Sequence, residues 1–159
     1  MHFMRMTPSW VSPSALRGRK VFIGRREGMS VAVTSEGELI LRLPLPLRSA
    51  QSRLEDWGVK VLPGRLPVTR VALAAGTAFQ QKVWRACLEI GRGESATYGE
   101  LARRIGCRSA QAVGQALGAN PLAQVIPCHR IRSAQGPGGF AWGPRLKSAW
   151  LKEESGGAA

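Results

Sequence analysis

The spacing of apolar residues changes once along the chain, near Ala74-Ala75-Gly76. Before this point apolar residues form short runs that are typical of β-strands, and after it they recur at the three- and four-residue intervals of a helix face. A chain of 159 residues forms one domain or two small ones. We therefore expect an α/β protein, with a small strand-rich N-terminal domain over residues 1–75 and a helical C-terminal domain over residues 76–159.

The N-terminal part contains several β-rich runs separated by turn residues. Residues 1–19 include prolines and lack an apolar period, so we expect a loose arm there. Gly28 and the Ser35-Glu36-Gly37 turn separate two or three antiparallel strands, the last of which ends at prolines. The expected elements are strands over residues 20–24, 29–37, 38–47 and 66–73 and a short helix over 51–58.

The C-terminal part is dominated by helix signals. Thr77 and Ser109 precede helical patterns as N-caps, and Thr97 with Glu100 forms a capping box. Two short helices separated by the tight turn at residues 106–108 are typical of a helix-turn-helix, here in a winged-helix-like unit. The expected helices cover residues 78–90, 97–106, 110–118 and 144–154.

The charge balance indicates a polyanionic partner. Lys and Arg total 23 against 10 Asp and Glu, a formal charge of +13. Nucleic acid is the commonest partner of such a basic protein, although a merely solvated basic surface is the alternative. No apolar run reaches the length of about 20 residues that a membrane span needs, and the first 20 residues lack the apolar core of a signal peptide. We expect a cytoplasmic, nucleoid-associated protein that is neither inserted in a membrane nor secreted.

The three cysteines lack the spacing of a disulfide framework or a zinc site, so we expect free thiols and no metal. Cys87 lies on the apolar face of its expected helix, and Cys107 lies in the turn of the helix-turn-helix. Cys128 occurs in Ile126-Pro127-Cys128-His129-Arg130, where adjacent His and Arg side chains can lower a thiol pKa. A buried structural cysteine and a nucleophile both fit this residue. Contact with His129 would require a bend at Pro127 or a bridging water, and Glu153 or Glu154 could orient His129.

Residues 76–154 resemble the O6-alkylguanine-DNA alkyltransferases, the methylated-DNA–protein-cysteine methyltransferases. The resemblance lies in the order and spacing of several motifs over about half of the chain. These motifs are GTAFQQKVW (76–84), TYGELA (97–102), AVGQALGANP (112–121), IPCHR (126–130) and the pattern formed by Gly143, Lys147, Leu151 and Glu154.

The resemblance implies repair of duplex DNA by base flipping and transfer of the alkyl group to a protein cysteine. The acceptor falls on Cys128, which His129 would activate through water while Glu154 orients His129. Tyr98 would help to discharge the guanine, and Asn120 would brace the active-site turn. Each molecule would act once, as a monomer and without a cofactor. The implied DNA contacts are Gln111, Arg108, Ala112, Gly114, Gln115, Leu117 and Arg130.

The chain departs from the family pattern at four places. Gln111 occupies the position of an arginine that fills the space left by the flipped nucleotide. The turn at Cys107-Arg108 is one residue short, and Ala141 replaces a polar residue in the loop before the final helix. The N-terminal part also lacks the cysteines and histidines that bind zinc in some members.

Three other functions remain open at this point. A lesion-binding sensor without transfer activity would explain Gln111, but such relatives replace the acceptor cysteine, commonly with tryptophan. A helix-turn-helix regulator that uses Cys128 as a sensor would need a dimer surface. A thiol hydrolase would need an oxyanion loop, and it would leave the positive charge unexplained.

Overall fold

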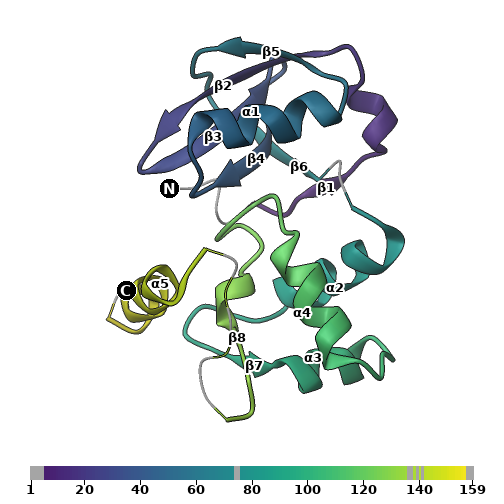
Figure 1. Ribbon diagram of the computed structural model, residues 1–159, viewed down its shortest axis with the longest axis vertical. Coiled ribbons are helices and arrows are strands. Elements are labelled where there is room, and N and C mark those ends of the chain that lie inside the picture. The colour runs from purple at the N-terminus through teal and green to yellow at the C-terminus, as the bar shows by residue number, and fades with distance from the viewer. Residues whose placement is uncertain (1–5, 74–75, 136–137, 139, 141, 157–159) are drawn as a thin grey trace. The chain divides into compact units, whose positions relative to one another are not determined.

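The computed structural model describes residues 6–73, 76–135, 138, 140 and 142–156 (Figure 1). The chain divides into two compact units, and each is described by itself. The first unit comprises residues 1–75 together with 121–125, and the second comprises residues 76–120 and 126–159. The units therefore differ from the expected domains in the short segment 121–125, which lies between two parts of the second unit in the sequence.

The first unit is built on a six-stranded mixed sheet with the strand order β1-β6-β4-β3-β2-β5. Strands β2, β3 and β4 pair antiparallel as expected, whereas β1 with β6, β4 with β6 and β2 with β5 pair in parallel. The strands are β1 (Ser9–Trp10), β2 (Lys20–Arg26), β3 (Met29–Thr34), β4 (Glu38–Leu43), β5 (Lys60–Pro63) and β6 (Arg70–Leu73).

The β2–β3 hairpin turns through Glu27 and Gly28, which both have positive φ. A two-residue turn of this kind matches the twist of the flanking strands, and glycine adopts the required conformation without a steric cost. Every residue of β3 and β4 is buried, so these two strands form the centre of the first core.

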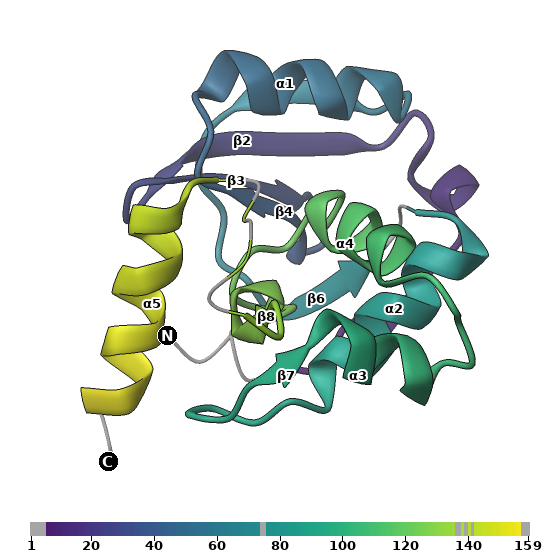
Figure 2. The same ribbon diagram turned by 60° about the horizontal axis from the view of Figure 1, so that its bottom comes forward.

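Helix α1 (Leu47–Asp56) lies over β2 and β5, which it contacts through a face that includes the buried Ala50 and Leu54 (Figure 2). It begins four residues before the expected helix at 51–58 and ends two residues earlier. Pro46 occupies the N-cap position of the helix with φ of −59°, and β4 already ends at Leu43, before Pro44 and Pro46 and four residues short of the expected strand end.

The expectation of a loose arm over residues 1–19 is wrong for residues 9–16. β1 pairs in parallel with β6, and the 3₁₀ turn η2 (Pro13–Leu16) places a fully buried Leu16 in the core. A two-residue strand and a single turn are too short to show a period in the sequence. β5 was also not expected, and β6 covers only the last half of the expected strand at 66–73.

The second unit contains the expected helices. Both Thr77 and Thr97 form complete capping boxes, with Gln80 and Glu100 respectively, and the Ser109 side chain accepts a hydrogen bond from the backbone of the third helix. These bonds satisfy backbone donors that a helix start leaves unpaired. The helices are α2 (Ala78–Leu88), α3 (Tyr98–Arg104), α4 (Ala110–Gly118) and α5 (Pro144–Gly156).

Helices α3 and α4 form the expected helix-turn-helix, which packs on α2. Gly106 has φ of +72° in the tight turn between them, a conformation that glycine adopts without strain. The indole Nε1 of the buried Trp84 in α2 donates to the carbonyl oxygen of Ala116 in α4 at 2.8 Å. A short parallel pair, β7 (Ala96–Thr97) with β8 (Ile131–Arg132), and the 3₁₀ turn η3 (Cys128–Arg130) complete the unit.

Candidate active site

Cys128 begins η3, and its local geometry depends on Pro127. Pro127 has φ of −80° and ψ of 60°, and the Cys128 N–H donates to the carbonyl oxygen of Ile126 at 2.8 Å. These are the features of an inverse γ-turn, which reverses the chain within three residues. The chain therefore bends at Pro127, one of the two ways in which the sequence allowed Cys128 and His129 to interact, and the bridging water stays a prediction. The cysteine is 5% exposed.

Asn120 holds the turn from inside the second unit. Its buried Nδ2 donates to the carbonyl oxygen of Ile126 at 2.9 Å and lies 3.3 Å from the Sγ atom of Cys128. One amide group thus joins both sides of the turn and reaches the sulfur itself. The role of Asn120 in bracing the active-site turn stays a prediction, to which these two contacts are relevant.

Burial raises the pKa of the Cys128 thiol to about 11, although the Asn120 hydrogen bond and the positive charge of Lys147 lower it. The neutral thiol therefore dominates near neutral pH. A base must accept the thiol proton as the sulfur reacts, because the thiolate is the nucleophile.

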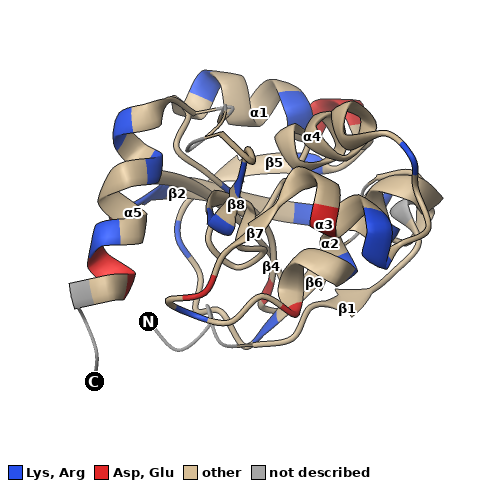
Figure 3. Ribbon diagram, turned by 90° about the horizontal axis from the view of Figure 1, so that it is seen from below, with Lys and Arg blue, Asp and Glu red and all other residues tan. Residues whose placement is uncertain are grey.

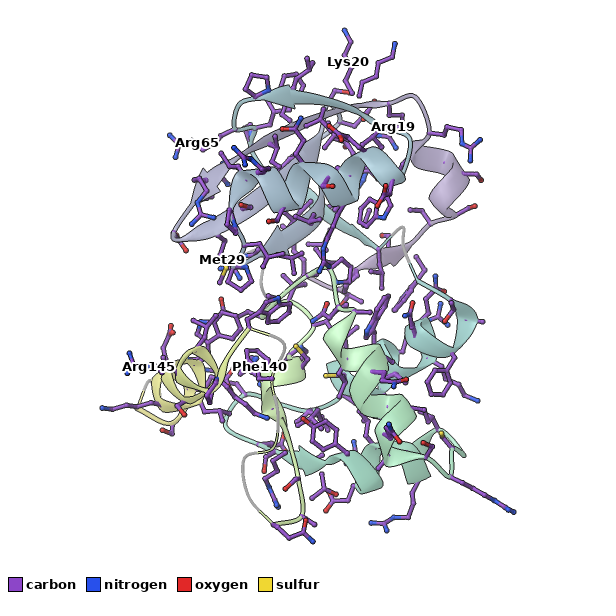
Figure 4. All side chains as sticks on the ribbon, in the orientation of Figure 1. Arg19, Lys20, Met29, Arg65, Phe140 and Arg145 are labelled. Carbon is purple, nitrogen blue, oxygen red and sulfur yellow. The ribbon has the colours of Figure 1, made fainter. Side chains whose placement is uncertain are left out.

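Lys147 is a buried residue beside the site for which the sequence predicted no role. Its side chain is 2% exposed, its Nζ donates to the carbonyl oxygen of Ile131 at 2.6 Å, and burial lowers its pKa. Nζ also lies 5.8 Å from the ring centroid of Phe140, which Figure 4 labels, and 6.0 Å from that of Tyr98. The only signal in the sequence is its place in the pattern that starts at Gly143. The side chain puts a buried cation near Cys128.

His129, Arg130 and Glu154 form a connected group beside Cys128. The Nε2 atom of the buried His129 lies 2.7 Å from Oε1 of Glu154, and Arg130 bonds both carboxylate oxygens at 2.7 to 3.1 Å. Of the two glutamates that the sequence offered, Glu154 and not Glu153 contacts His129 in the structure. The His129 ring also meets Trp150 edge to face, with centroids 5.4 Å apart.

The proton positions follow from these contacts. Burial alone would raise the pKa of Glu154, but the bonds from Arg130 and His129 outweigh it and lower that pKa. Burial lowers the pKa of His129 despite its contact with Glu154. A neutral His129 donates through Nε2–H to the ionised Glu154, which leaves the lone pair on Nδ1. Nδ1 is buried and makes no hydrogen bond to any described residue, so it is the nitrogen that can accept a proton.

A cavity of about 590 Å³ connects the sulfur with the helix-turn-helix. Figure 3 marks the basic residues on α2, α3 and α5 of the same unit. Ala141 lies outside the described residues. The cavity brings several of the expected site residues together. Its lining residues are Tyr98, Ala110, Gln111, Gly114, Gln115, Leu117, Gly118, Cys128 and Phe140.

The expected DNA contacts differ in accessibility. Arg108, Gln111 and Gln115 are exposed, and Ala112 and Gly114 are partly exposed, whereas Leu117 is buried at 5% exposure. Arg130 is occupied by Glu154 and by the carbonyl oxygen of Ile90 at 2.6 Å. DNA contacts by Leu117 and Arg130 stay predictions that this geometry does not support.

The pKa of Cys128 can be tested without DNA. As long as the pH stays below the pKa, each increase of one pH unit raises the thiolate fraction about tenfold. The rate of Cys128 alkylation by iodoacetamide should therefore rise about tenfold per pH unit from pH 7 to 9 without levelling. Peptide mass mapping at each pH would give the rate, with free cysteine as the control that levels off near its pKa of about 8.5. A plateau for Cys128 below pH 9 would contradict the raised pKa.

Comparison with known proteins places this site in a family. The family model described as the DNA-binding domain of 6-O-methylguanine DNA methyltransferase matches residues 78–156. The chain is also 36% identical over 147 residues to a methylated-DNA–protein-cysteine methyltransferase of Methanosarcina acetivorans, covering 86% of this chain and 92% of that protein. The chain belongs to the methylated-DNA–protein-cysteine methyltransferase family.

The chain spans different shares of the length of its other relatives. The regulatory protein Ada of Salmonella typhimurium is 50% identical over 82 residues, and the chain spans only 23% of that protein. The crystal structure of the Mycobacterium tuberculosis O6-methylguanine methyltransferase is 30% identical, with a TM-score of 0.68 over 88% of this chain and 94% of that one. A complex of the M. tuberculosis protein with DNA is 29% identical, with a TM-score of 0.66 over 86% and 93%.

These findings confirm the family resemblance and the α/β fold class. Among the described residues, no helix combines the length and the apolar character that crossing a membrane requires.

Proposed function

We propose that this chain repairs DNA by transferring an alkyl group, such as methyl, from O6-alkylguanine in duplex DNA to Cys128. The observation that carries the proposal is the cavity, which has the reactive sulfur in its wall and the exposed side of the helix-turn-helix at its border. A base rotated out of the duplex can reach a sulfur in such a pocket, whereas a stacked base cannot.

The proposed transfer is a single displacement. The sulfur attacks the alkyl carbon, the S–C bond forms, and the bond between that carbon and guanine O6 breaks. His129 takes the thiol proton at Nδ1 through a water molecule, and the ionised Glu154 stabilises the resulting imidazolium. Tyr98, which lines the same cavity, donates its hydroxyl proton to the departing guanine and regains through solvent the proton that His129 accepted, so guanine leaves as the neutral base. The product thioether is stable, so each chain reacts once.

Helix α4 suits a close approach to DNA. A Cβ atom added at Gly118 would meet no described atom within 4 Å, and one added at Gly114 would make only an ordinary contact with the Tyr98 ring at 3.8 Å. Packing inside the chain therefore does not require these glycines. Their smallness lets α4 approach the minor groove, where a wedge can hold open the gap left by a flipped base.

Within this proposal, the groups that contact DNA are the accessible ones of the expected set, namely Arg108, Gln111, Ala112, Gly114 and Gln115. The described active-site groups come from one chain, which supports a monomer as the acting form, and the DNA substrate supports a cytoplasmic, nucleoid-associated location. The relative whose solved structure contains DNA supports the nucleic-acid partner.

Intact-mass spectrometry would test the proposal. The chain is mixed with a duplex oligonucleotide that carries one O6-methylguanine, and the unmethylated duplex serves as the control. A gain of one CH₂ group that saturates at one per chain and maps to Cys128 is the expected result. Tight lesion binding without a mass change would favour a sensor, and a label on Cys87 or Cys107 would contradict the acceptor assignment.

Gln111→Arg should tighten DNA binding and steepen its salt dependence by about one released counterion, because the new side chain adds one charge at the exposed start of α4. Fluorescence anisotropy over a range of salt concentrations would measure the slope. Gln51→Arg adds the same charge on the exposed side of α1, away from the helix-turn-helix sequence, and should leave the slope unchanged. An unaltered slope for Gln111→Arg would show that residue 111 does not approach the DNA backbone.

A further inference from the structure

We propose that Arg42 is a positioning residue for alkyl transfer, because it holds residues 121–124 in the conformation that brings Asn120 and Cys128 together. This inference rests on the proposed function of Cys128. Arg42 lies in β4, far from the cysteine in sequence, and none of the motifs of the helical part includes it.

The backbone of Arg42 binds the segment as a sheet neighbour would. Its N–H donates to the carbonyl oxygen of Pro121 at 2.9 Å, and its carbonyl oxygen accepts the N–H of Ala123 at 2.9 Å. Together these bonds form a parallel bridge between Arg42 and Leu122. All of these residues belong to the first unit, so segment 121–123 extends its sheet at the end of β4.

The guanidinium group fixes the next two residues. Nη1 donates to the carbonyl oxygen of Ala123 at 2.9 Å and to Oε1 of Gln124 at 2.8 Å, and the Arg42 residue is only 2% exposed. Gln124 has φ of +68°, a left-handed conformation that is unfavourable for a residue with a side chain. Such a conformation persists only where its surroundings hold it, and Arg42 bonds the residue and its predecessor.

The segment leads directly into the reactive turn at both of its ends. Asn120 precedes Pro121, and Ile126 follows the buried Val125. The carbonyl oxygen of Ile126 accepts bonds from both Asn120 Nδ2 and the Cys128 N–H, so the two ends of the segment meet beside the sulfur. We therefore expect a change in the path of residues 121–125 to alter the 3.3 Å contact between Asn120 and Sγ.

This contact is sensitive to small movements. The bond from Asn120 stabilises the thiolate, and hydrogen bonds weaken steeply when the distance or angle departs from the optimum. A displacement of about 1 Å at a reacting group can slow a reaction on the order of a hundredfold. Arg42 thus acts on the reaction through Asn120 and does not touch the alkyl group.

The test replaces Arg42 in two ways. Arg42→Lys keeps a positive charge but loses the planar fork of donors, and Arg42→Met fills similar space without donors. Arg25 offers a control in the same unit. It is an exposed residue, and its guanidinium bonds the carbonyl oxygens of Leu45 and Gly28 and the Ser30 hydroxyl, none of which lies in segment 121–125. The controls are Arg25→Lys and Arg25→Met.

Three quantities are measured on each folded variant: the melting temperature, the single-turnover rate of methyl transfer from an O6-methylguanine duplex, and the pH dependence of Cys128 alkylation by iodoacetamide. The Arg42 variants should transfer methyl at least tenfold more slowly. In a plot of the logarithm of the iodoacetamide rate against pH, their line should shift by about one pH unit to higher pH, which is an about tenfold lower rate at each pH. This shift is expected when a hydrogen bond to the thiolate is lost. The Arg25 variants should melt at lower temperature with both rates unchanged.

Gln124→Ala keeps the test decisive if the Arg42 variants fail to fold, because it removes only one acceptor of the guanidinium. It should shift the iodoacetamide line in the same direction by itself, and where Arg42→Lys also folds, the two substitutions should act non-additively. Variants that lose thermal stability but keep the wild-type pH profile and transfer rate would overturn the inference. If the wild-type chain itself transferred no methyl group, the proposed function would fail, while the iodoacetamide profile would still decide the role of Arg42.

Discussion

Cys128→Ser should leave no detectable methyl transfer while it changes the affinity for methylated duplex by no more than about threefold. A buried serine hydroxyl is a far weaker nucleophile than a thiolate and has no soft atom to attack a saturated carbon. Affinity for DNA depends mainly on phosphate contacts, to which the 5% exposed Cys128 contributes little. We therefore expect this single substitution to separate DNA binding from alkyl transfer.

Mass spectrometry for transfer and fluorescence anisotropy for binding measure the two effects on the same preparation. Cys107→Ser makes the same chemical change at a partly exposed turn residue. Its Sγ accepts the N–H of Ser109, a bond that a serine oxygen can also accept, so this variant should transfer normally. Transfer by Cys128→Ser at a rate near that of the wild type would mean that another residue receives the alkyl group.

Glu154→Gln should slow methyl transfer by on the order of a hundredfold and lower the free energy of unfolding by about 2–3 kcal/mol. The carboxylate side chain is 8% exposed and accepts bonds from His129 and Arg130. A glutamine keeps one acceptor oxygen, turns an NH₂ group toward other donors, and leaves the Arg130 charge without its carboxylate. His129 then loses the group that sets its tautomer and stabilises its protonated form.

The pH dependence of this loss has a defined sign. The pKa of Glu154 is lowered in the folded chain, so its stabilisation is fully present above its unfolded pKa of about 4.3 and disappears as the pH falls through the lower folded value. The stability difference between wild type and Glu154→Gln should therefore be largest near neutral pH and shrink in acid. Urea unfolding at several pH values would measure it.

Glu153→Gln provides the control for Glu154→Gln. Glu153 is exposed on the same helix, and its substitution should change the free energy of unfolding by no more than about 0.5 kcal/mol. Equal behaviour of the two variants in both assays would contradict the arrangement of Cys128, His129 and Glu154.

The parts of the fold that the sequence predicts are those with local signals. The capping boxes at Thr77 and Thr97 involve residues three positions apart, so both helix starts follow from the sequence alone. The antiparallel strands β2, β3 and β4 are neighbours in the chain and are joined by short turns. The association of Cys128 with His129 and Glu154 followed from the family pattern, and the structure places the His129 and Glu154 side chains in contact, while the link from His129 to the Cys128 thiol stays a prediction.

The remaining features depend on partners that are distant in the chain. β1 and β5 are short edge strands whose parallel partners are not their neighbours in sequence, so neither hydrophobic period nor turn residues indicate them. The burial of Lys147 depends on the carbonyl oxygen of Ile131, and that of Arg42 on residues 121–124. A lysine or arginine in isolation predicts an exposed side chain, and only the tertiary contacts reverse this expectation.

The bond between Arg42 and Ala123 joins residues 81 positions apart, and this separation has a consequence for the order of folding. Closing so long a loop costs chain entropy before any contact compensates for it, so pairings of this kind form late and slow the folding of a domain. During synthesis the β2–β4 meander emerges and pairs well before residue 122 leaves the ribosome. We therefore expect the turn that carries Cys128 to reach its native conformation after the β2–β3–β4 meander has formed, so the thiol becomes competent late in folding.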